Sequence, residues 1–149
     1  MDIAFDSNRL LYVADYSNNR IQRFSYGSPT GITLTGMTLS NPTAVFTTDT
    51  GFLYVLDFSN YRVLRWNNSQ TVVVAGGQGS GTTLNKISTS YGLFVDPNHN
   101  VYISEYGNHR VSLWTNGNTT IGRLVNFRYR NHTRQKEMIL YYFQIYFSR

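Results

Sequence analysis

Cysteine is absent from this chain of 149 residues. That absence excludes disulfide bonds, zinc sites built on thiolates and a cysteine nucleophile. No apolar run reaches the roughly 18 residues that a membrane-spanning helix needs. The N-terminal segment Met1–Asp6 also lacks the basic stretch and the long apolar stretch of a secretory signal peptide. The sequence therefore predicts no membrane span, and it leaves the compartment of the protein open.

An excess of charge of one sign is missing from most of the chain, although the formal net charge is +5. Through Gly122, seven Arg or Lys residues balance seven Asp or Glu residues. The excess lies in the last 27 residues, where six Arg or Lys residues accompany the single acid Glu137. A basic surface is the usual electrostatic sign of binding to nucleic acid or to an anionic membrane. The neutral region therefore lowers the expectation of RNA binding.

Three near-copies of a fourteen-residue phrase are the main feature that the chain does contain. They start 42 and 48 residues apart, a period that indicates stacked supersecondary units. The copies are LYVADYSNNRIQRF at Leu11–Phe24, LYVLDFSNYRVLRW at Leu53–Trp66 and VYISEYGNHRVSLW at Val101–Trp114.

Each copy is predicted to form the two middle strands of a four-stranded antiparallel unit, with one short apolar strand before it and one after it. Both faces of the second strand are apolar, as in sheets that are stacked on both sides, so we expect an all-β propeller. A two-layer sandwich is the alternative, and the close repeat argues against it. The predicted first strands are residues 3–6, 44–47 and 92–96, and the predicted fourth strands are residues 31–34, 71–75 and 119–121.

Every copy contains the pattern acid-x-x-Asn-x-Arg, which predicts a device that fixes a hairpin. The acid can accept hydrogen bonds from turn amides, the Asn tolerates a left-handed backbone, and the Arg begins the next strand within reach of the acid. An anion-binding rim built from the three arginines is the alternative. The signature residues are Asp15, Asn18, Arg20, Asp57, Asn60, Arg62, Glu105, Asn108 and Arg110. Arg23 and Arg65 are predicted candidates for a partner surface, because Leu113 replaces them in the third copy.

These phrases resemble the NHL repeat, whose units read roughly Y-V-A-D-x-x-N-x-R-I. Residues 12–15, Asn18, Arg20 and Ile21 match it closely, whereas Leu56, Ser104 and Glu105 depart from it. The resemblance covers residues 2–122 and implies a β-propeller of four-stranded blades, usually six in a closed ring. The predicted blades are residues 2–36, 43–76 and 91–122, which would make an incomplete ring.

The resemblance implies a non-enzymatic binding scaffold that contacts a protein or peptide through loops on one rim. The alternatives are the substrate-recognition part of a ubiquitin-ligase-type protein, with its catalytic module absent from this chain, and a binder of single-stranded RNA. One related branch is a metal-dependent amidating lyase, but no ligand set for it can be placed here. His99 and His109 are predicted to be solvated turn residues without a second metal ligand at the required spacing. The glycine-rich residues 75–83 lack the ending of a phosphate-binding loop and are predicted to be a flexible connection, so no cofactor is expected.

A stack of three blades would leave two apolar faces uncovered, which predicts either a longer protein or two chains paired into a six-bladed ring. Residues 123–149 are basic and aromatic and depart from the repeat. They are predicted to be an irregular or helical tail, and translated non-coding sequence is the alternative. Glycosylation sequons at Asn67, Asn118 and Asn131 favour an extracellular origin, although turns rich in Asn also produce such triplets by chance.

Overall fold

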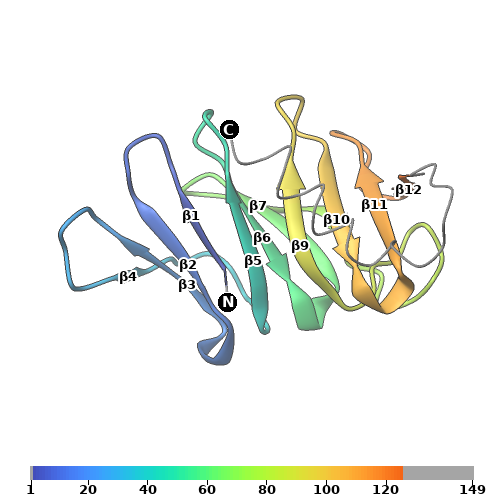
Figure 1. The fold of residues 1–149 in the computed structure, drawn as a ribbon, viewed down its shortest axis with the longest axis horizontal. Coiled ribbons are helices and arrows are strands. Elements are labelled where there is room, and N and C mark those ends of the chain that lie inside the picture. The colour runs from blue at the N-terminus through green and yellow to red at the C-terminus, as the bar shows by residue number, and fades with distance from the viewer. Residues whose placement is uncertain (1, 126–149) are drawn as a thin grey trace, which may run out of the picture.

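Three four-stranded antiparallel sheets stand side by side in the computed structural model, which describes residues 2–125 (Figure 1). Strands follow one another in chain order within each sheet. The first sheet contains β1 (Ile3–Phe5), β2 (Leu11–Asp15), β3 (Arg20–Phe24) and β4 (Ile32–Thr33). The second contains β5 (Pro42–Thr47), β6 (Leu53–Asp57), β7 (Arg62–Trp66) and β8 (Thr71–Gly76). The third contains β9 (Ser90–Val95), β10 (Val101–Glu105), β11 (Arg110–Trp114) and β12 (Arg123–Leu124). The predicted all-β class and the three four-stranded blades are confirmed.

The hydrophobic cores lie between neighbouring sheets. All five residues of β6 are buried, because the first sheet covers one face of this strand and the third sheet covers the other. Burying each such aliphatic side chain contributes about 1.5–3 kcal/mol. The first core includes Ala14, Ile21, Val55, Leu64 and Trp66. The second includes Leu56, Val63, Ala75, Ile103 and Trp114. Leu39 and Ile87, from the connections between blades, complete these two cores.

The turn between the second and third strands of each sheet is a single turn of 3-10 helix. These turns are η1 (Tyr16–Asn18), η2 (Phe58–Asn60) and η3 (Tyr106–Asn108). The residue after each turn has a left-handed backbone: Asn19, Tyr61 and His109 have φ values of 54°, 50° and 51°. The prediction that the signature Asn takes this conformation is therefore wrong by one position. No helix within residues 2–125 is long and apolar enough to cross a membrane.

The fourth strand of the third sheet also differs from its prediction. Residues 119–121 are not a strand, and Arg123–Leu124 pairs with Ser112 and Leu113 instead. The residues before Ile121 form a turn instead of a strand. The Asn118 amide N–H donates to the Thr115 carbonyl, and the Asn118 side chain accepts from the Thr120 amide. The third sheet therefore reaches Leu124. The rest of the predicted tail, with the Asn131 sequon, lies outside the described residues.

The strands β1, β5 and β9 form the inner edge of the row (Figure 1). Side chains connect these strands across the gaps between sheets. The Val45 amide donates to Asp2 Oδ2 at 3.1 Å, and the Thr47 hydroxyl donates to the Phe5 carbonyl at 2.6 Å. The Thr43 hydroxyl donates to the Ser90 carbonyl at 3.2 Å. The first strand of each sheet therefore faces the centre about which the blades turn.

Candidate functional site

In the second copy of the signature, the acid Asp57 is fully buried and fully paired. Its Oδ2 accepts from Arg62 Nε at 2.7 Å and from Asn60 Nδ2 at 2.8 Å. Its Oδ1 accepts from the Ser40 backbone amide at 2.7 Å, and the side chain is 0% exposed. A buried carboxylate is tolerated only where charged and polar partners replace its lost hydration. The Asn acts here as a side-chain donor rather than as a left-handed residue.

The third copy repeats this arrangement with a longer acid. Glu105 Oε1 lies 2.9 Å from Arg110 Nε, an ion pair without an aligned hydrogen bond. Glu105 Oε2 accepts from Asn108 Nδ2 at 2.7 Å and from the Ser88 amide at 3.2 Å. The extra methylene of Glu105 is therefore accommodated with the same kinds of partner. We call the acid, Asn and Arg of one copy the signature clamp.

The signature clamps of the second and third copies also hold the chain that arrives from the preceding blade. Arg62 Nη2 donates to the Thr38 carbonyl at 2.6 Å. Arg110 donates to the Thr82 carbonyl at 2.6 Å and to the Lys86 carbonyl at 2.8 Å, while Asn108 donates to the Gly81 carbonyl at 2.8 Å. The glycine-rich connection that the sequence predicts to be flexible is thus bonded at several carbonyls. These guanidinium groups are directed at protein oxygens, which favours a structural role over an anion-binding one.

The acid and the arginine of the first copy are more exposed to solvent than those of the other two copies. Asp15 Oδ2 accepts from Arg20 Nε at 2.8 Å, and Asn18 Nδ2 donates to both carboxylate oxygens at 2.9 Å. The Asp15 side chain is 16% exposed and that of Arg20 is 39% exposed. The hydrogen bonds from Arg20 and Asn18 lower the pKa of Asp15 below its usual value, because they favour the ionised carboxylate.

Arg23 and Arg65 lie directly across the strand pair from Tyr12 and Tyr54. The guanidinium carbon of Arg65 is 4.8 Å from the centre of the Phe52 ring, a cation–π contact. Burial raises the pKa of the Tyr54 hydroxyl, while Arg65 acts in the opposite direction. Both arginines are half-buried and stand on the faces of their sheets. Their role as a partner surface remains a prediction.

The His99 side chain is half-buried and contacts Tyr54 and Phe52, the residues that lie beside Arg65. Its Nδ1 is 3.0 Å from the Tyr54 hydroxyl, and its ring meets the Phe52 ring edge-on at 5.5 Å. The prediction of a merely solvated turn residue is therefore wrong for His99, whereas His109 is exposed. Within residues 2–125, no three His, Asp or Glu side chains gather in a way that could hold a metal ion.

The loops that join first to second strands lie at one end of the sheets, which we call the loop end (Figure 1), and those of the first and third sheets share one construction. Asp6 Oδ1 accepts from the amides of Asn8 and Leu10, each at 2.9 Å. Asp96 Oδ1 accepts likewise from Asn98 and Asn100, each at 2.9 Å. These bonds order the loops, because they satisfy amides that the strand ladders leave free.

An open hollow of about 390 Å³ lies along the inner strands toward the loop end. Phe46 and Phe94 meet edge to face at 5.2 Å, and Ile3 and Phe5 are 57% and 61% exposed. The sequence does not reveal this hollow, because its walls come from three separate sheets. Its lining residues are Asp2, Ile3, Ala4, Phe5, Val45, Phe46, Thr47, Leu93 and Phe94.

Comparison with known proteins agrees with this architecture. Residues 2–24 match the family model of the NHL repeat. A comparison with curated protein sequences finds no match.

Three solved structures share the fold. A nidogen/laminin complex is 18% identical with a TM-score of 0.66, over 83% of this chain and 46% of the other. An auxiliary nutrient binding protein from Bacteroides thetaiotaomicron is 14% identical with a TM-score of 0.64, over 85% of this chain and 35% of the other. Virginiamycin B lyase from Staphylococcus aureus is 12% identical with a TM-score of 0.60, over 87% of this chain and 41% of the other. At these identities the likeness shows the β-propeller fold alone, and this chain spans less than half the length of each structure.

Proposed function

We propose that this segment of an NHL-type β-propeller is a non-enzymatic scaffold that binds a protein or peptide at its loop end. The observation that carries the proposal is the open hollow beside the ordered loops, which is lined mainly by residues with apolar side chains. Ile3 and Phe5, two of its lining residues, are 57% and 61% exposed, in part because no blade covers the outward face of the first sheet. Exposed apolar side chains grouped on a rigid rim are what a docking partner buries. The likeness to a nidogen/laminin complex supports this proposal as an analogy of fold.

The lining of the hollow favours binding over catalysis. Its two hydrogen-bonding side chains are Asp2 and Thr47. One oxygen of Asp2 accepts from the Val45 amide, and the Thr47 hydroxyl donates to the Phe5 carbonyl. These groups therefore connect neighbouring sheets instead of pointing freely at a substrate. The likeness to virginiamycin B lyase supplies a contrasting analogy, since that protein is an enzyme.

A peptide selection tests the proposal. Peptides that bind the full chain are selected from a displayed random library, and their affinities are then measured for Phe5→Ser. We expect this change to weaken binding at least about tenfold, because it removes the most exposed ring of the hollow. Ile32→Ser is the matched control, since Ile32 is 58% exposed on the outer strand β4. Selected peptides that bind Phe5→Ser as tightly as the parent chain would contradict the loop-end site.

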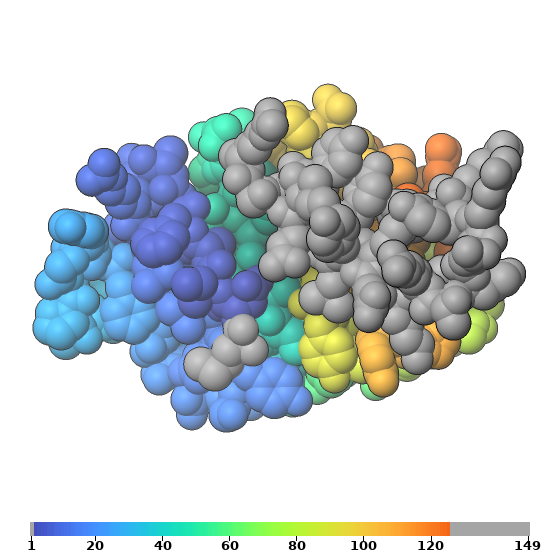
Figure 2. Space-filling model, viewed as in Figure 1, coloured from blue at the N-terminus to red at the C-terminus, as the bar shows by residue number. Residues whose placement is uncertain are grey.

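The outward face of the first sheet supports a further proposal about partners, the completion of the ring. The same positions are covered in the other two sheets: Ile3 is 57% exposed, whereas its counterparts Val45 and Leu93 are 3% and 9% exposed. Figure 2 shows the first sheet, in blue, at one end of the row. Two chains paired into a six-bladed ring, or further blades of a longer protein, would cover this face.

Light scattering on the purified chain tests this completion. We expect a particle of twice the 17.1 kDa chain mass, because an exposed blade face costs free energy that pairing removes. An unfolded or aggregated chain would instead support the longer protein. A folded, dispersed monomer would contradict both forms of the proposal.

A further inference from the structure

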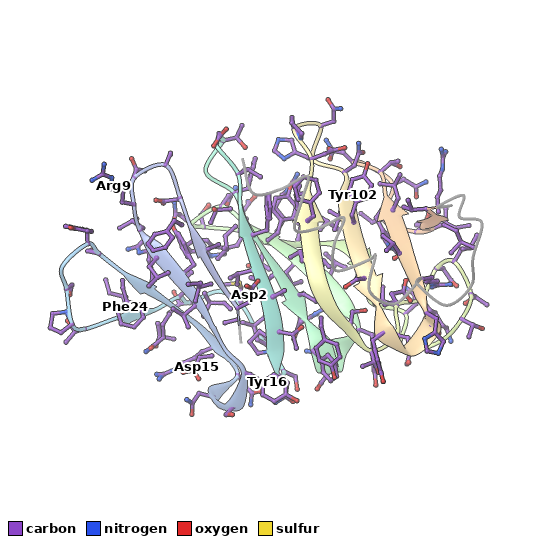
Figure 3. All side chains as sticks on the ribbon, in the orientation of Figure 1. Asp2, Arg9, Asp15, Tyr16, Phe24 and Tyr102 are labelled. Carbon is purple, nitrogen blue, oxygen red and sulfur yellow. The ribbon has the colours of Figure 1, made fainter. Side chains whose placement is uncertain are left out.

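The end of the sheets opposite the loops carries a continuous row of rings, which we call the aromatic ladder. Its members are Tyr16, Phe58, Tyr91, Tyr106 and His109. The centroids of successive rings are 6.2, 5.5, 6.2 and 6.2 Å apart. The ladder crosses all three sheets. In Figure 3, Tyr16 lies beside Asp15 at this end, whereas Arg9 lies at the loop end.

The repeat itself places most of these rings. Tyr16, Phe58 and Tyr106 each follow the signature acid directly and begin the turns η1, η2 and η3. His109 adds the left-handed residue after the last turn. Every copy therefore places one aromatic ring at this position, at the end of its sheet opposite the loop end.

Tyr91 joins the row through an irregularity in its strand. The pairing of β9 with β10 passes from Ser90 to Gly92 with a register shift, which leaves Tyr91 without a partner. Such a bulge re-aims a side chain, and here the Tyr91 ring stands between Phe58 and Tyr106. The corresponding residue in β5, Thr43, is buried and bonded to the Ser90 carbonyl. The third sheet therefore fills a gap that would otherwise divide the ladder.

The ladder is exposed at one end and carries little charge. Tyr91 and Tyr106 are 56% and 66% exposed and His109 is exposed, whereas Tyr16 and Phe58 are half-buried. The signature acids at this end are each paired with their Arg, so the turns present hydroxyl and amide groups rather than free charges. The interplanar angles between successive rings are 61°, 31°, 64° and 64°, so most neighbours meet edge to face.

We infer that the aromatic ladder is a docking surface for a proline-rich segment in the polyproline II conformation. Such segments dock in grooves lined by aromatic rings, and their preformed helix loses little entropy on binding. A row of rings whose neighbouring charges are paired with one another fits an uncharged ligand with compact rings. Single-stranded nucleic acid is disfavoured, because it needs cations for its phosphates and flat, open ring faces for its bases. Laid end to end, four steps of this length accommodate at most roughly eight residues at about 3.1 Å each.

Fluorescence anisotropy with a labelled decaproline peptide and the full chain tests this inference. We expect saturable binding that Tyr106→Ala and Tyr91→Ala each weaken at least about tenfold. Both side chains are largely exposed, so these variants should keep the fold, which circular dichroism checks. Tyr26→Ala is the matched control, because Tyr26 is 87% exposed in the loop after β3, and its removal should leave affinity unchanged.

Comparison probes separate this site from the other possibilities. A glycine-serine peptide of equal length and an oligouridine should bind at least about tenfold more weakly than decaproline. Tighter binding of oligouridine would overturn the inference in favour of base stacking, and equal binding of all three probes would overturn it as non-specific. Phe5→Ser should leave decaproline affinity unchanged, so failure of this inference is distinct from failure of the loop-end proposal.

Discussion

Replacing Asp57 with alanine is expected to lower the free energy of unfolding by about 3–5 kcal/mol, the usual cost of breaking a buried ion pair. The carboxylate of Asp57 is 0% exposed and bonds Arg62, Asn60 and the Ser40 amide. Without it, one guanidinium and two further donors lose an acceptor that is itself fully buried, and the Arg62 side chain is only 25% exposed. Urea denaturation followed by circular dichroism measures the loss.

Asp15→Ala is the matched control, since Asp15 holds the same place in the first copy. Its side chain is 16% exposed, and its described bonds come from Asn18 and Arg20 alone, so water can replace much of what is lost. We expect a clearly smaller loss for this variant. Equal losses for the two variants would show that burial does not set the strength of the signature clamp.

Gly76→Ala is expected to destabilise the second blade by about 3 kcal/mol, through a strained backbone and a steric clash. Gly76 has a φ of 69°, a backbone angle that residues other than glycine rarely adopt. An added Cβ would collide with the Tyr61 carbonyl oxygen and lie 2.5 Å from Ile87 Cδ1 in the second core. Neither neighbour can move freely, because the Tyr61 carbonyl accepts from Gly77 and Ile87 is fully buried.

Gly51→Ala separates the two causes. Gly51 has a φ of 83°, but nothing lies within 4 Å of its added Cβ. This variant should lose only the backbone contribution of about 1–2 kcal/mol. Thermal unfolding of both variants measures the difference, and equal losses would show that the clash at Gly76 is relieved by movement.

The repeat predicts the strands well where both faces of a strand are apolar. Leu53–Asp57 is such a strand, and it lies between two cores as expected. The strand prediction fails where contacts between distant residues determine the course of the backbone. Gly122 donates its amide to the Leu84 carbonyl and packs against the Trp114 ring, so the chain joins the third sheet only at Arg123. The local sequence at residues 119–121 carries no sign of that contact.

The candidate sites were harder to predict than the fold, for the same reason. The hollow needs three inner strands to converge, which no single repeat encodes. The ring after each signature acid is visible in the aligned copies, and it could have indicated three members of the aromatic ladder. Tyr91 could not have been found in this way, because its direction depends on a bulge in β9. The left-handed residue was misplaced because the signature Asn donates to the acid instead.

The second and third signature clamps hold the incoming connection with residues of their own blade, and this has a consequence for how such chains grow. The repeats start 42 and 48 residues apart, yet the clamps bond both connections at backbone carbonyls and amides. A duplicated repeat would therefore carry its own signature clamp. That clamp could bond a connection of different sequence or length from the preceding blade. Gene duplication could lengthen the array one unit at a time without redesigning the joints.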